Sequence, residues 1–232
     1  MIPKKIHYCW FGGNNKGNLI EKCIKSWHKY CPDYEIIEWN EQNFDVHQSS
    51  FSKKMHSEKK WAFVADYARF VVLEKYGGFY LDTDMELFKS LDNLLSNNLV
   101  LGEEEKGIIS AGAIGANVNN NYISLCKKYY DENPNVLKTV PMIMTEIFKS
   151  LNNKENILAL PPLAFYPYSQ QTIKNFNEKD LSNETYGVHH WNYSWGNPLL
   201  RTLNKFSFYH LLKTILDKLG LKKSIKKILG LA

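Results

Sequence analysis

The stretch 61–88 constrains the fold of this 232-residue chain more than any other. Its first half is densely apolar on more than one side, which predicts a mostly buried helix. Gly77-Gly78 then ends the helix, because glycine readily adopts the left-handed conformation that closes a helical C-terminus. The run Phe79–Leu81 predicts a short strand, and this strand delivers Asp82 and Asp84 beyond its end.

The two carboxylates indicate a metal site. Side chains two apart on an extended segment point the same way, so we expect Asp82 and Asp84 to face one point. Carboxylates that face one point repel unless a cation lies between them, and Mg²⁺ or Mn²⁺ suits such a position. Upstream, Asp66 and Arg69 share one face of the predicted helix, where burial is costly without a partner or a ligand.

Each of these signals is weak alone. An isolated Asp-x-Asp is common, and Asp66 with Arg69 is also consistent with an ordinary intrahelical ion pair worth about 0.3–0.5 kcal/mol. A calcium loop beginning at Asp82 is excluded, because it needs glycine at its sixth position and glutamate at its twelfth. The chain has Leu87 and Asn93 there. The order of the motifs is the informative feature.

That order resembles the signature of glycosyltransferase family 32. The core of the resemblance is Asp66-x-x-Arg69, Lys75-Tyr76-Gly77-Gly78 and Tyr80-Leu81-Asp82-Thr83-Asp84. Softer matches extend it over about residues 2–196, at Ile2–Gly13, Phe165-Tyr166-Pro167, His189-His190-Trp191 and Ser194-Trp195. The family includes bacterial capsular polysaccharide transferases and yeast outer-chain mannosyltransferases, and it is distantly similar to the glucosylating clostridial toxins.

The predicted fold class is α/β. A strand at 6–11, a helix at 19–30, a strand at 34–39 and the strand before Asp82 alternate as in a mainly parallel sheet. The resemblance implies a GT-A type nucleotide-sugar-binding fold with a mixed, mainly parallel sheet over residues 1–200. Other segments are predicted as a polar loop or helix entry (49–60), an exposed turn (103–106), a strand-like run of small residues (108–116), helices (122–130 and 140–151) and the frame of an acceptor cleft (161–167).

The resemblance also implies roles for single residues. His190 is expected to complete the metal site of Asp82 and Asp84, and only one of His189 and His190 can do so because adjacent strand residues point oppositely. A histidine pair at a surface or in packing is the alternative.

The nucleotide-sugar contacts follow in the same way from the resemblance. On its residues alone Trp10 is more readily a core tryptophan, whereas the resemblance implies that it stacks on the nucleotide base. Tyr80, Asp66, Arg69 and Ser194 are further expected donor contacts, and Trp195 is expected near the leaving-group oxygen.

The expected activity is metal-dependent, retaining transfer of a hexose from a nucleotide-sugar, with UDP-hexose favoured. The expected acceptor is a lipid-linked glycan in capsular or other surface polysaccharide synthesis. No covalent nucleophile is evident, which favours attack by the acceptor on the leaving-group face. Transfer to a protein side chain is one alternative, and a non-catalytic carbohydrate-binding protein is another that the intact Asp66, Arg69, Asp82 and Asp84 argue against.

Residues 201–232 form a distinct segment, predicted to be a basic amphipathic helical tail. It holds eight basic residues and one acid, a net +7 against +5 for the whole chain, which leaves −2 for the rest. Such a helix suits an anionic membrane surface, and packing on the domain is the alternative. Nucleic acid is not expected as a partner, because no recognition motif accompanies the charge.

The expected location is the cytoplasm, at the inner face of the cell membrane. No secretory signal or spanning run is visible in the chain. Its four cysteines show no zinc-binding spacing and are expected to be reduced, structural thiols.

Overall fold

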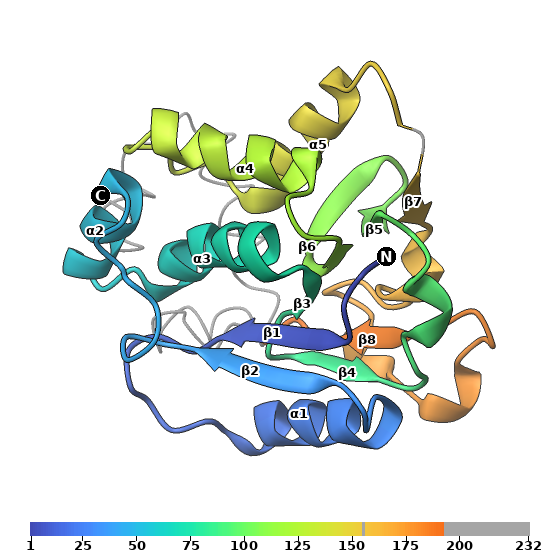
Figure 1. The fold of residues 1–232 in the computed structure, drawn as a ribbon. Coiled ribbons are helices and arrows are strands. Elements are labelled where there is room, and N and C mark those ends of the chain that lie inside the picture. The colour runs from blue at the N-terminus through green and yellow to red at the C-terminus, as the bar shows by residue number, and fades with distance from the viewer. Residues whose placement is uncertain (155, 193–232) are drawn as a thin grey trace, which may run out of the picture. The chain divides into compact units, whose positions relative to one another are not determined.

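The computed structural model describes residues 1–154 and 156–192 (Figure 1). Ser194, Trp195 and the predicted tail at 201–232 therefore lie outside the described residues. The helices are α1 (Asn18–Tyr30), α2 (Ser50–Ser57), α3 (Trp61–Tyr76), α4 (Asn121–Glu132) and α5 (Val140–Ser150). The strands are β1 (Lys5–Cys9), β2 (Glu35–Trp39), β3 (Gly78–Leu81), β4 (Met85–Leu87), β5 (Leu99–Glu105), β6 (Ile108–Ala116), β7 (Ile157–Leu160) and β8 (Gly187–His189).

The central sheet is mixed and mainly parallel, which confirms the predicted fold class. Its strand order is β2-β1-β3-β6-β5-β7. β1 pairs in parallel with both β2 and β3, and β5 pairs in parallel with β7. Only β6 runs against its neighbours β3 and β5. Strands β4 and β8 form a separate antiparallel pair beside this sheet.

Alternate residues of the central strands supply two apolar cores, one on each face of the sheet. Tyr80 and Leu101 pack with side chains of α2, α3, α4 and α5. Phe79 and Leu81 pack on the opposite face with α1 and β4. Figure 1 shows this layering, with α3, α4 and α5 on one side of the sheet and α1 on the other. Strands buried on both faces explain the nearly continuous apolar runs of the sequence.

The predicted glycine stop after α3 is confirmed, and packing adds to the backbone reason for it. Gly77 and Gly78 have φ values of +60° and +100°. A β-carbon at Gly78 would lie 2.8 Å from the carbonyl oxygen of Lys5 in β1. Both the left-handed conformation and the close approach of β1 therefore exclude a side chain, and β3 can start directly beside β1.

Two local predictions were wrong in part. Residues 49–60 were expected to be a loop or helix entry, but α2 forms there, capped by the Ser49 hydroxyl, which accepts from the Ser52 amide. Phe51 and Met55 bury the apolar side of this short helix. Residues 103–106 were expected to be an exposed turn, but β5 continues to Glu105 with register shifts against β6.

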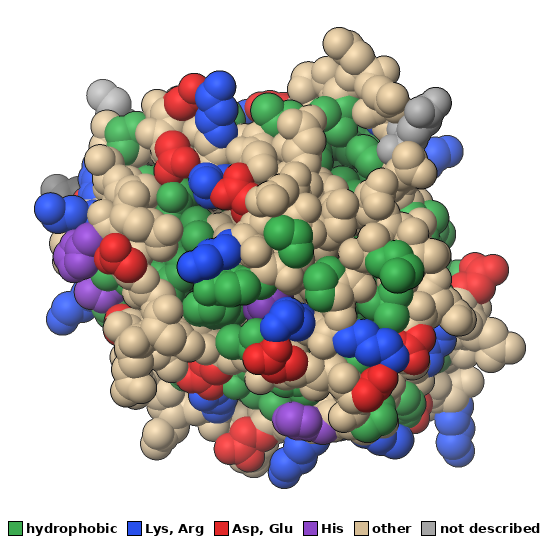
Figure 2. Space-filling view, in the orientation of Figure 1, with side chains coloured by type: hydrophobic (Ala, Val, Ile, Leu, Met, Phe, Trp, Pro, Cys, Tyr) green, Lys and Arg blue, Asp and Glu red, His purple; other side chains and the backbone are tan. Residues whose placement is uncertain are grey.

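The surface drawn in Figure 2 carries acidic and basic side chains interspersed, without a large area of one sign. This agrees with the small net charge of the residues that precede the tail. All four cysteines are buried as free thiols. Within residues 1–154 and 156–192, no helix has the length and apolar character needed to cross a bilayer.

A buried histidine links three central elements. His7 of β1 is fully buried, and its Nε2 lies 2.8 Å from the Gly77 carbonyl oxygen. The Trp39 indole N–H of β2 donates to His7 Nδ1 at 3.1 Å. The ring is therefore the neutral tautomer, with Nε2 donating and Nδ1 accepting. Burial is the main reason that the pKa of His7 falls from 6.5 to about 4.

This arrangement predicts a loss of stability in mild acid. Between pH 6.5 and 4 the unfolded chain binds a proton at His7 that the folded chain rejects, so the free energy of unfolding falls as the pH falls. The full effect is about 3 kcal/mol. Urea unfolding at pH 7 and pH 5 should show a larger loss for the wild type than for His7→Gln, which retains a donor and an acceptor. Equal losses in both proteins would contradict the prediction.

Candidate metal centre and active site

The two aspartates lie on a tight turn that leads out of the central sheet. The amide of Asp82 donates to the Gly112 carbonyl, which continues the β3–β6 pairing by one residue. The amide of Met85 then donates to the Asp82 carbonyl at 2.9 Å, and this bond closes the turn. The predicted extended geometry of Asp82 and Asp84 is therefore wrong. Their side chains converge because a turn, rather than a strand, carries them.

The separate β4–β8 ladder brings a histidine from far along the chain to this turn. Met85 of β4 is paired with His189 of β8, and the His190 amide donates to the Asp84 carbonyl at 3.0 Å. On the side away from β4, β8 is fixed by the His189 amide, which donates to the carbonyl of Phe165. The register of two short strands thus selects which side chain faces the aspartates.

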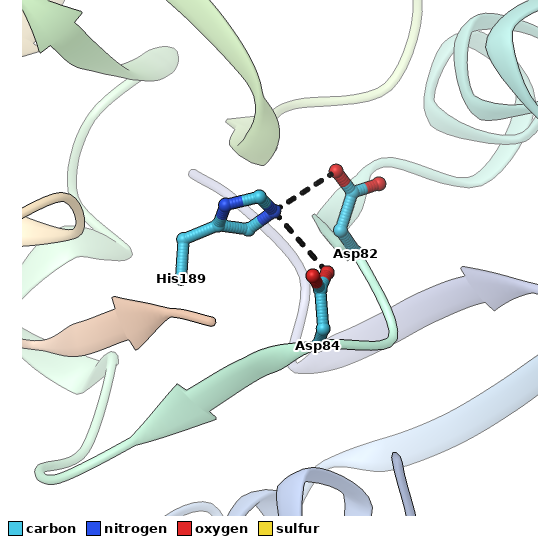
Figure 3. Close-up of side chains that lie close together, drawn as sticks. All are labelled: Asp82, Asp84 and His189. Carbon is cyan, nitrogen blue, oxygen red and sulfur yellow. Dashed lines mark ion pairs between the residues drawn. The ribbon is translucent and has the colours of Figure 1, made fainter. Parts of the chain in front are cut away.

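Asp82, Asp84 and His189 form a compact cluster of possible metal ligands. One side-chain ligand atom from each lies within 4.8 Å of the others. His189 Nε2 lies 3.2 Å from Asp84 Oδ1 and 3.7 Å from Asp82 Oδ2. Figure 3 shows the imidazole nitrogen directed at both carboxylates.

His190, the histidine expected at the metal, points elsewhere. Its Nε2 lies 2.8 Å from Glu86 Oε2, and Lys22 of α1 forms an ion pair with the same carboxylate at 2.9 Å. The structure thus places His189 beside the aspartates and His190 on Glu86. The sequence correctly implied that only one of the two could face the cluster, but the choice depends on the β4–β8 register, which the sequence does not reveal.

Arg69 joins the helix α3 to this cluster. Its guanidinium donates to Asp66 Oδ1 at 2.6 Å, to the Ala111 carbonyl at 2.9 Å and to Asp82 Oδ1 at 3.3 Å. The guanidinium also lies over the Tyr80 ring, 4.6 Å from its centroid. Arg69 is 5% exposed, so its donors are directed at the protein, and it holds Asp66 and Asp82 in place.

Burial and charge set the protonation of these groups. Burial raises the pKa of Asp66 to about 7, although Arg69 opposes that change. Burial also favours the neutral form of Asp82, but Arg69 and His189 outweigh it and hold the pKa of Asp82 below its usual value. Burial disfavours a charged His189, yet Asp84 and Asp82 raise the pKa of His189 to about 10. The imidazolium therefore lies between the carboxylates as a cation.

A divalent cation fits this cluster. Two carboxylates and an imidazole nitrogen are ligands that Mn²⁺ and Mg²⁺ accept, and the two carboxylates that raise the pKa of His189 would also favour a cation between them. Nε2 is the ring nitrogen of His189 that is directed at the cluster, and within the described part of the chain the buried Nδ1 has no hydrogen-bond partner.

The remaining predicted residues fall into three groups: Trp10 is partly accessible, Tyr80 is buried, and two residues lie outside the described part of the chain. Trp10 is half-buried just after the end of β1, so part of its ring is accessible. Its indole N–H donates to the Asn14 carbonyl, and Lys16 lies 5.6 Å from its ring centroid. Tyr80 is 2% exposed beneath Arg69, which argues against its expected direct contact with a nucleotide-sugar. Ser194 and Trp195 lie outside the described residues.

Sequence reasoning missed Glu86. It follows Asp84 by two residues, and it is 5% exposed between His190 and Lys22. A buried acid needs compensating partners, and these two supply them. The acidic i, i+2, i+4 series from Asp82 was visible in the sequence, but its division into two aspartates at the cluster and one glutamate behind it depends on the turn.

Two family models match the sequence. The first, described as a glycosyltransferase sugar-binding region containing a DXD motif, matches residues 17–101. The second, an alpha 1,4-glycosyltransferase conserved region, matches residues 118–213.

Characterised proteins with similar sequences include lactosylceramide 4-alpha-galactosyltransferase of Mus musculus, which is 31% identical over 148 residues. That match covers 56% of this chain and 40% of the mouse protein, so this chain matches well under half of that relative. Inositol phosphoceramide mannosyltransferase 2 of Schizosaccharomyces pombe is 25% identical over 220 residues, covering 85% of this chain and 59% of the yeast protein.

The fold is also similar to solved structures. The glycosyltransferase GlyE of Streptococcus pneumoniae TIGR4 matches with a TM-score of 0.51 and 16% identity, covering 95% of this chain and 64% of that structure. At this identity the similarity concerns the fold. The two family models confirm the predicted resemblance to the DXD-motif glycosyltransferases, and GlyE agrees with it in fold.

Proposed function

We propose that this protein is a metal-dependent, retaining hexosyltransferase that uses a nucleotide-sugar, with UDP-hexose favoured, and extends a lipid-linked glycan. The observation that carries the proposal is the Asp82–Asp84–His189 cluster, with its ligand atoms within 4.8 Å of one another beside the Arg69–Asp66 ion pair. A bound divalent cation would neutralise the diphosphate leaving group as a Lewis acid.

The protein's own residues supply orientation around this cluster. Arg69 holds the Asp82 and Asp66 side chains apart and in fixed directions. Asp66 stays partly exposed, with a side-chain exposure of 16%, so its carboxylate can accept hydrogen bonds from hydroxyls of the transferred hexose. Trp10 offers an indole face to the nucleotide base from the end of β1, where ligands bind in open α/β sheets.

The names of the sequence relatives support the hexose and the lipid-linked acceptor. By their names, one transfers galactose to lactosylceramide and another transfers mannose to inositol phosphoceramide, so both act on ceramide lipids. The mouse enzyme forms an alpha linkage, which is retention if its donor is also alpha-linked. Transfer to a lipid-linked glycan also agrees with a capsular or surface polysaccharide role at the cytoplasmic face of the membrane.

Removal of the metal should abolish turnover. We expect one member of a panel of UDP- and GDP-hexoses to be hydrolysed slowly with Mn²⁺ and not with excess chelator. Asp84→Ala should lower this rate at least about 100-fold, because it removes a carboxylate that would hold the cation beside the leaving diphosphate. The measurement is nucleotide release by chromatography. Undiminished turnover in chelator would contradict a metal-dependent mechanism.

The two adjacent histidines should differ in metal binding. His189→Ala should raise the dissociation constant for Mn²⁺ about tenfold or more, measured by calorimetry, because a ligand is lost. His190→Gln is the matched control, since glutamine can still donate to Glu86, and it should bind Mn²⁺ within about threefold of wild type. Loss of affinity in the control alone would instead assign His190 to the metal.

The proposed tail should direct the enzyme to anionic lipid. We expect the full-length protein to sediment with vesicles containing phosphatidylglycerol and not with phosphatidylcholine vesicles, because each lysine near an anionic surface contributes about 1 kcal/mol. Replacing Lys222, Lys223, Lys226 and Lys227 by glutamate should abolish sedimentation while leaving hydrolysis of the soluble donor unchanged. Undiminished sedimentation of this variant would contradict lipid binding by the tail.

A further inference from the structure

Tyr166 carries a buried hydroxyl that has no well-formed hydrogen bond within the described residues. The residue is 4% exposed and follows the 3₁₀ turn at Pro162–Ala164. Its ring packs against His189, with ring centroids 5.5 Å apart, and against Trp191 at 6.0 Å. Among residues 1–154 and 156–192, no group forms a hydrogen bond of normal geometry with Tyr166 Oη, although the Ser110 side chain is close enough to oppose the effect of burial on its pKa. A buried hydroxyl without a partner is costly, so a partner from outside the fold is a reasonable expectation.

This hydroxyl is directed at the edge of the metal cluster. The hydroxyl lies against Gly112 of β6, since a β-carbon built on that glycine would be 2.8 Å from Tyr166 Oη. The same β-carbon would lie 2.9 Å from Asp82 Oδ2 and 3.4 Å from His189 Cδ2. The phenol oxygen, a carboxylate oxygen and the imidazole edge therefore converge on bare backbone. A side chain at Gly112 would clash with both oxygens, so glycine is what lets them lie this close to the backbone and to each other.

A second tyrosine shows that a missing partner alone does not identify a site. In the part of the chain that the structure describes, the buried Tyr130 hydroxyl also has no hydrogen-bond partner. Its ring, however, packs among aromatic rings of α2 and α3, including Phe51 at 4.7 Å and Phe70 at 6.0 Å between centroids. Tyr166 differs because its hydroxyl and a carboxylate of the predicted metal cluster meet at one glycine.

We propose that the Tyr166 hydroxyl is a specificity-determining contact that hydrogen-bonds a sugar hydroxyl beside the Asp82–Asp84–His189 cluster. The inference rests on the proposed transferase function. A phenol is neutral and both donates and accepts, so it matches a sugar hydroxyl, whereas the diphosphate carries charge that suits the cation. The transferred hexose and the acceptor both offer this chemistry, and the experiment separates them.

The test compares Tyr166→Phe with Tyr130→Phe in the full-length protein. Each change removes one buried, unpartnered hydroxyl and keeps the ring, so both variants should have melting temperatures equal to or above that of the wild type. Calorimetry with Mn²⁺ would measure binding of UDP or GDP and of the matching UDP- or GDP-hexoses. A transfer assay would then use methyl glycosides of galactose, glucose and mannose as acceptors.

Two results would support the inference. If the bonded hydroxyl belongs to the transferred hexose, Tyr166→Phe weakens nucleotide-sugar binding at least about fivefold and leaves binding of the nucleoside diphosphate unchanged. If the bonded hydroxyl belongs to the acceptor, Tyr166→Phe leaves donor binding and donor hydrolysis unchanged and raises the acceptor KM at least about fivefold. In either case Tyr130→Phe should stay within about twofold of the wild type.

Three results would overturn it. One is Tyr166→Phe with unchanged donor binding and unchanged acceptor kinetics, as expected if a buried water satisfies the hydroxyl. Another is an equal effect in Tyr130→Phe, or an equal loss of nucleoside diphosphate binding, since either indicates a general structural change. The third is a wild type that binds no nucleotide-sugar with Mn²⁺, which overturns the transferase proposal as well and is thereby distinguished from the other two.

Discussion

The site depends on how the fold keeps like charges close together. Asp66, Asp82 and Asp84 converge where α3, β3 and the turn after β3 meet, and carboxylates in a poorly hydrated place repel strongly. Arg69 lies between the first two, and the protonated His189 lies between the last two. The site is therefore built around alternating charge, and the position of His189 is where the proposed cation would take over the role of the proton.

Much of this fold follows from local sequence. Apolar runs with periods near two and near 3.6 predicted most strands and helices, and the α/β class is confirmed. The glycine pair after α3 was predicted from backbone conformation alone, because only glycine suits its φ values and the contact with β1. These features depend on neighbours in the chain or on simple periodicity.

The features that the structure places differently from the sequence expectation depend on distant pairings. The choice of His189 over His190 follows from the register of β4 against β8, and the turn that carries Asp84 follows from where β3 leaves β6. Tyr80 was expected at the ligand, but the Arg69 guanidinium covers its ring. Local propensity does not encode such relations, because a shift of one residue in a three-residue strand reverses its faces.

The β4–β8 ladder also has a consequence for how the protein is made. Glu86 of β4 and His190, which follows β8, are 104 residues apart. Helix α1 contacts β4 through the Trp27 indole, which donates to the Met85 carbonyl. Closing so long a loop is slow, and domains fold as their chains emerge from the ribosome. A nascent chain with the aspartates in place still lacks β8 and its imidazole. Competence to bind the proposed cation should therefore arise only after β8 has left the ribosome.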